Sequence, residues 1–142
     1  MNRLFFTFLI FCTLSCYSQV SVSLKELSGT KWKIVDTEDE LILHITEYTN
    51  SYRKTTTTFK TSGREASVQN KYYLSDYIPS SFEHSRVGKS TRGTYIISYN
   101  SVLNTFAYVV IKQFDSKRGM MVIHRPARSG VTPGDIPYQK IK

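Results

Sequence analysis

Apolar and polar residues alternate along most of the chain after residue 29. In residues 41–46, for example, Leu41, Leu43 and Ile45 alternate with Ile42, His44 and Thr46. This two-residue period is typical of a β-strand with two differently exposed faces. Residues 52–59 contain four consecutive threonines, whose stiff, branched side chains suit a pleated strand. Strands are predicted over residues 31–35, 41–46, 52–59, 65–74, 95–99, 105–114, 120–125 and 138–141.

The segments between these strands carry turn residues. Asp, Asn, Gly and Pro mark turns because each suits a backbone conformation that regular strands do not use. The only helical candidate is a short turn at residues 24–28. Loops and turns are predicted at 61–63, 75–81, 88–93, 100–104 and 115–119, with a short extended piece at 82–87 and a loop or an extended arm at 126–137.

About eight short strands with short connections predict an all-β domain. No helical period continues beyond two turns, and no internal repeat is visible. Antiparallel strands in such a chain close into a barrel or stack as two sheets. The fold predicted is a single antiparallel β-barrel of about eight strands, and a β-sandwich is the alternative.

The N-terminus has the pattern of a secretory signal. Arg3 precedes a short apolar stretch, and small residues follow up to residue 19. This stretch is shorter than the ~20 residues that a membrane-spanning helix needs. We therefore expect a signal peptide at 1–19, a folded domain at 20–142, and a secreted or periplasmic protein. The alternative is lipid anchoring at the outer membrane through Cys16.

Two short stretches resemble known families. The stretch 27–34, with Gly29 and then Trp32 opening the first strand, resembles the start of the lipocalin-like (calycin) β-barrels. That resemblance implies that Trp32 closes one barrel end and that a late basic residue, here Arg125, packs over it. Residues 72–97 are similar to small secreted proteins of Bacteroidetes bacteria, which implies a fold and a compartment but no reaction.

The charge of the chain is strongly positive but evenly spread. The formal net charge is +8, and no run of five or more like charges occurs. A nucleic-acid-binding tail is therefore not indicated. Residues 88–91 resemble the end of a phosphate-binding loop, but position 83, where that motif needs glycine, is Glu83. No nucleic-acid or nucleotide partner is expected.

No motif points to catalysis, and the enzyme question stays open with a non-enzyme favoured. The chain lacks the Gly-x-Ser-x-Gly elbow of many hydrolases. His44, His84 and His124 lie in separate segments, so neither a metal site nor a cofactor is expected. The acidic residues at 36–40 are interpreted as a solvated turn, since they lack the glycine and ligand spacing of a calcium loop.

Aromatic residues supply the remaining functional signal. In a small barrel, inward tyrosines can line a ligand cavity and offer their hydroxyls to it. We expect Tyr72, Tyr95, Tyr99 and Phe106 to line such a cavity. The function predicted is non-catalytic binding of a small apolar or amphipathic ligand.

A second class of function is kept as the alternative. It is a surface interaction module that uses basic loops to contact a protein, an anionic envelope polymer or a membrane surface. Arg86, Lys89 and Arg92 would then matter more than the cavity. A hydrolase or isomerase acting in the cavity is a weaker third, and the oligomeric state is not predicted.

Overall fold

The computed structural model describes residues 20–35 and 40–142, and these form a closed antiparallel β-barrel. Each barrel strand pairs with the next one along the chain, and the last strand pairs with the first to close the ring. The barrel strands are β2 (Thr30–Ile34), β3 (Ile42–Tyr48), β4 (Tyr52–Phe59), β5 (Arg64–Ser75), β7 (Tyr95–Asn100), β8 (Thr105–Asp115), β9 (Met120–Arg125) and β10 (Gly134–Ile141). The all-β barrel prediction is confirmed. The expected signal peptide and part of the acidic turn lie outside the described residues.

One local prediction was wrong. The piece expected to be extended near residue 84 contains a single 3-10 turn, η1 (His84–Arg86). The last strand begins at Gly134, earlier than expected and within the segment predicted as a loop or an extended arm. Pro137 is tolerated within β10, where its carbonyl accepts a hydrogen bond from the Val35 N–H at 3.0 Å. Proline lacks only the donor half of the backbone pair, so it can stay where that donor is not needed.

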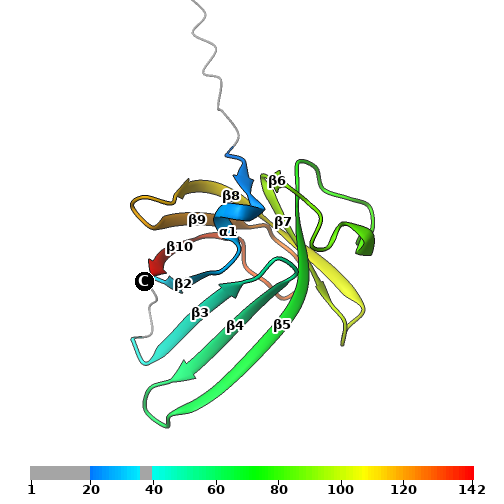
Figure 1. Ribbon diagram of the computed structural model, residues 1–142. Helices are drawn as coiled ribbons and strands as arrows, with labels where there is room; N and C mark the ends of the chain where they lie inside the picture. Colours follow the sequence, from blue (N-terminus) through cyan, green and yellow to red (C-terminus); the bar gives the residue numbers. More distant parts are fainter. Residues whose placement is uncertain (1–19, 36–39) are drawn as a thin grey trace, which may run out of the picture.

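One end of the barrel is covered by the first described segment. Figure 1 shows β1 (Val22–Ser23) and α1 (Leu24–Leu27) above this end, with β6 (Arg92–Gly93) beside β1. Ser23 and Glu26 form a capping box that satisfies backbone donors at the start of the short helix. Leu27 is completely buried and belongs to the core, so this cover seals the end of the barrel.

Aromatic side chains fill the barrel below this cover. Trp32, Tyr48 and Tyr72 are almost completely buried. The indole N–H of Trp32 donates to Thr30 Oγ1 at 2.7 Å, and its ring lies 5.7 Å from that of Phe114. We call this end, from α1 down to these rings, the packed end.

The other end of the barrel is different. It carries the turns that follow β4, β7 and β9, and the β4–β5 hairpin projects beyond it (Figure 1). Val68 and Phe59 in this hairpin are exposed, as are Val102 and Leu103 in the turn between β7 and β8. We call this the open end, and the space between the two ends holds the candidate site.

Candidate binding site in the barrel

A cavity of about 340 Å³ lies inside the barrel. Its walls mix aliphatic side chains with polar and basic ones. A second hollow of about 470 Å³ shares Arg53, Ser98, Ala107 and Arg128 with the cavity, so the two adjoin. The cavity is lined by Ile34, His44, Arg53, Thr55, Ser98, Ala107, Tyr108, Val109, Ile123, Arg125, Arg128, Ile136 and Tyr138.

The pairing of the strands explains why polar residues reach this interior. Residues that face each other across antiparallel strands share one face of the sheet. Arg53 on β4 is paired with the buried Tyr48, and Thr55 is paired with the buried Thr46. The threonine-rich strand therefore turns Arg53 and Thr55 inward. The sequence predicted this strand but gave no means of knowing which of its faces is internal.

Arg53 is the most unusual residue of the cavity. Part of its side chain lines the cavity, while its Nε atom is buried and has no hydrogen-bond partner among the described residues. The guanidinium carbon lies 6.0 Å from the centre of the Tyr48 ring. Burial by itself lowers the pKa of Arg53, but Tyr48 and Tyr138 beside it raise that pKa above its usual value. The guanidinium therefore stays charged.

Two other buried polar atoms near Arg53 also lack a partner within the described part of the chain. They are the hydroxyl oxygens of Tyr48 and Ser98. Burial raises the pKa of Tyr48 to about 12, so its hydroxyl remains protonated at neutral pH. Buried polar groups in folded proteins are nearly always hydrogen-bonded, and exceptions call for an explanation. Here Arg53 and Ser98 line one cavity, and Tyr48 packs beside Arg53.

The remaining charged groups of the cavity are basic. Arg125 donates from Nε to the carbonyl oxygen of Thr132 at 3.1 Å, and Arg128 is exposed at the open end. His44 lies 2.9 Å from Thr57 Oγ1 through Nδ1. No acidic residue lines either hollow, as far as the described residues go. The cavity thus combines aliphatic walls with uncompensated positive charge.

The four residues predicted to line the cavity do not come together. Tyr72 is completely buried in the packed end, where its hydroxyl donates to the carbonyl oxygen of Thr49 at 2.6 Å. Tyr95 and Tyr99 alternate with the buried Ile96 and with Ser98, which lines the cavity, so they face outward.

The outward pair contacts other aromatic rings. Tyr95 packs edge-on against Tyr108, and Tyr99 stacks on Phe82 with ring centres 4.9 Å apart. Of the four residues, Phe106 alone lines a hollow, the one that adjoins the cavity. The alternation in this strand was predicted correctly, but its more aromatic face was wrongly taken as the inner one.

The expected contact of Arg125 with Trp32 is also wrong. Trp32 is buried in the packed end, as predicted, but its aromatic neighbour is Phe114. Arg125 pairs with Gly134 at the start of β10, whereas Trp32 pairs with Lys140 near its end. The two side chains therefore lie toward opposite ends of the barrel.

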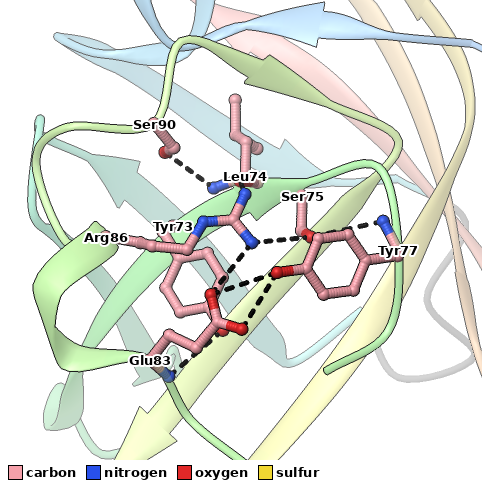
Figure 2. A network of polar contacts seen from close by, with 7 residues as sticks. All are labelled: Tyr73, Leu74, Ser75, Tyr77, Glu83, Arg86 and Ser90. Carbon is pink, nitrogen blue, oxygen red and sulfur yellow. Dashed lines mark hydrogen bonds and ion pairs between the residues drawn. The ribbon is translucent and has the colours of Figure 1, made fainter. Parts of the chain in front are cut away.

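A second arginine, Arg86, sits in a separate network outside the barrel (Figure 2). Its guanidinium donates to Ser75 Oγ, to the carbonyl oxygen of Leu74 and to Glu83, at 3.1, 3.1 and 3.3 Å. It also lies over the rings of Tyr73 and Tyr77, at 4.7 and 5.2 Å from their centres.

The same network fixes the loop that follows β5. The Tyr77 hydroxyl donates to Glu83 Oε1 at 2.9 Å, and the Glu83 backbone N–H donates to the Tyr73 hydroxyl at 3.3 Å. Ser90 Oγ accepts from the Leu74 N–H at 3.0 Å (Figure 2). Because these groups satisfy one another, the network is interpreted as structural.

The histidines are spread over the molecule. His124 faces outward and lies 2.7 Å from Asp135, while His84 packs on Phe82 and Tyr99. His44 lines the cavity. Among residues 20–35 and 40–142, no cluster of three or more histidine, cysteine or acidic side chains is arranged to hold a metal ion. No helix in that same part of the chain is both long and apolar enough to cross a membrane.

No match to this chain is found among protein-family models, curated proteins or solved structures. The architecture, a closed barrel of eight antiparallel strands, is consistent with a lipocalin-like barrel.

Proposed function

We propose that this protein is a non-catalytic binding protein that holds a small amphipathic ligand inside its barrel. The single observation that carries this proposal is the cavity of about 340 Å³ between the packed end and the open end. Pockets for small molecules commonly measure about 300–1,000 Å³, are mostly apolar, and contain a few placed polar groups. The cavity meets each of these conditions.

The walls indicate an amphipathic rather than a purely apolar ligand. Ile34, Val109, Ile123 and Ile136 offer an aliphatic surface. Arg53 and Ser98 offer donors with no partner within the described chain. A ligand with an apolar part and a polar group would match both kinds of wall.

The compartment belongs to the same proposal. The pattern of residues 1–19 supports export from the cytoplasm, and the barrel architecture supports a lipocalin-like protein of the small secreted type. The basic residues on the surface support the alternative function less well. Arg86 donates to Glu83 and Ser75, and Arg92 donates to Ser21, so both already have partners within the chain.

Binding of a neutral fluorescent amphiphile tests the proposal. N-phenylnaphthylamine brightens when it leaves water for an apolar site, and we expect saturable brightening with the purified protein. Native mass spectrometry of protein purified without detergent should show an extra mass that is lost on denaturation. Absence of both signals would contradict the proposal.

A pair of variants on one strand locates the bound probe. Ala107 lines the cavity, whereas Val110 on the same strand pairs with the outward-facing Tyr95. Ala107→Phe should fill the cavity and abolish brightening, and Val110→Phe should leave it unchanged. Equal brightening in both variants would place the probe outside the barrel and contradict the proposal.

A further inference from the structure

We propose that the ligand carries an oxyanion, a carboxylate or a sulfate- or phosphate-like group, and that Arg53 binds this group inside the barrel. This inference rests on the proposed function, because it names the chemical class of the molecule in the same cavity. It depends on the balance of charge and hydrogen bonds around Arg53.

The charge of Arg53 is the first argument for an anion. None of the ion pairs among the described residues includes Arg53. A buried or half-buried charge is costly unless an opposite charge and hydrogen bonds accompany it. Tyr48 stabilises the guanidinium only in part, since burial raises its pKa to about 12 and keeps its hydroxyl neutral at physiological pH. An anion in the cavity would supply the missing charge.

The hydrogen-bonding groups left over are of the type that an oxyanion needs. The Arg53 Nε–H is a buried donor without an acceptor among the described residues, and the Ser98 hydroxyl on β7, two strands away in the barrel, is a second such group; both residues line the cavity. The planar guanidinium matches a carboxylate or phosphate geometrically and binds either with two parallel hydrogen bonds. A cationic ligand, or one without a hydrogen-bond acceptor, would leave these donors without a partner.

The described residues that line the cavity and the adjoining hollow favour negative charge. Arg128 lines both the cavity and the adjoining hollow, and Arg125 lines the cavity. No acidic side chain among the described residues lines either space. Positive charge in a cleft with apolar walls concentrates anions there and speeds their entry. Arg125 and Arg128 therefore help to attract the anion, while Arg53 makes the binding contact with it.

Probes with one chain length and different head groups test this inference. Octanoate, octyl sulfate, octanol and octyltrimethylammonium should compete with N-phenylnaphthylamine for the cavity at concentrations below their micelle thresholds. We expect the two anions to bind more tightly than octanol by about tenfold or more, an effect comparable to one charge-assisted hydrogen bond. Octyltrimethylammonium should bind more weakly than octanol. Inorganic sulfate alone shows whether the apolar tail is needed.

Two substitutions assign the preference to Arg53. Arg53→Met keeps the length of the side chain but removes its charge, and it should reduce the preference for octanoate over octanol to less than about threefold. Arg53→Lys keeps the charge without the planar fork and should give an intermediate preference. Arg118→Met is the matched control, since it removes one positive charge from an exposed side chain outside the cavity. It should leave the preference unchanged.

The outcomes separate this inference from the proposed function. If the probe and octanol bind but octanoate binds no better, the cavity binds ligands and the anion inference is wrong. If Arg53→Met retains the full preference, the anion lies elsewhere and the inference is also wrong. If neither the probe nor any octyl compound binds, both the function and the inference are overturned. Should Arg53→Met fail to fold, Arg53→Lys decides by the same criterion.

Discussion

Arg53 and Arg86 make a useful comparison because both lie against tyrosine rings and yet differ in every other contact. Arg86 lies over Tyr73 and donates to Ser75, Leu74 and Glu83. Arg53 lies farther from its tyrosine, has no ion pair among the described residues, and has a buried Nε without an acceptor. Contact with an aromatic ring therefore does not distinguish a structural arginine from one available to a ligand.

The difference lies in where the hydrogen-bond donors point. Those of Arg86 are used within the chain, where they tie the loop after β5 to the outside of that strand (Figure 2). The Nε donor of Arg53 is buried without an acceptor among the described residues, and Arg53 lines a cavity of aliphatic and basic groups. Removal of Arg86 should therefore harm the fold, whereas removal of Arg53 should harm binding.

The largest effect is expected from the packed end that supports the cavity. Trp32 is completely buried against Phe114, and Trp32→Ala removes a large side chain that its neighbours cannot replace. The free energy of unfolding should fall by about 3–5 kcal/mol in a denaturant titration. The control Leu103→Ala truncates a side chain that is 68% exposed and should change it by less than about 1 kcal/mol. Similar values for the two variants would contradict the packed end described here.

Alkaline pH should affect the tyrosine beside Arg53 strongly. Burial raises the pKa of Tyr48 to about 12, while an unfolded chain has a tyrosine pKa of about 10. The folded state therefore holds its proton more tightly, and stability present below pH about 10 is lost as the pH rises toward about 12. The loss at pH about 12 should be of the order of 2–3 kcal/mol.

Tyr48→Phe isolates this contribution from other alkaline effects. The variant lacks the hydroxyl that titrates, so the difference in unfolding free energy between it and the native protein should change with pH over that window. A difference independent of pH would show that the Tyr48 hydroxyl is not held in a buried site.

Arg86→Met should have a moderate effect on stability. It removes the hydrogen bonds to Ser75 and the Leu74 carbonyl and the ion pair with Glu83. The side chains of Arg86 and Glu83 are about a third exposed or slightly less, so solvent weakens the ion pair. We expect a loss of about 1–3 kcal/mol in chemical denaturation, with binding of the fluorescent probe unchanged. A variant as stable as the native protein would contradict the structural role of this network.

The sequence revealed the strands more fully than it revealed the site. Alternating apolar residues predicted the barrel strands because each has one buried face, and Trp32 was correctly expected in the core. The same alternation cannot tell which face is internal where both faces carry large side chains. For that reason Tyr95 and Tyr99 were assigned to the cavity, although neither of them lines it or the adjoining hollow.

Arg53 was missed for a related physical reason. An arginine beside threonines reads as part of a solvated strand face, and only pairing with Tyr48 and Thr46 on β3 turns that face inward. The informative pattern lies in β3, where Thr46 and Tyr48 are buried and therefore mark the internal face of the hairpin. β3 and β4 form a hairpin, whose register depends on the turn between them and on which face is buried, so neither strand alone reveals it.

The most direct test of the account is the stability of Arg53→Met measured with and without octanoate. Without octanoate, the variant should be within about 1 kcal/mol of the native protein or more stable, because it replaces an uncompensated charge with an apolar side chain. With octanoate in excess, the native protein should gain stability through binding, and the variant should gain little. A variant that is destabilised as much as Arg86→Met, and that gains as much from octanoate as the native protein, would contradict the account.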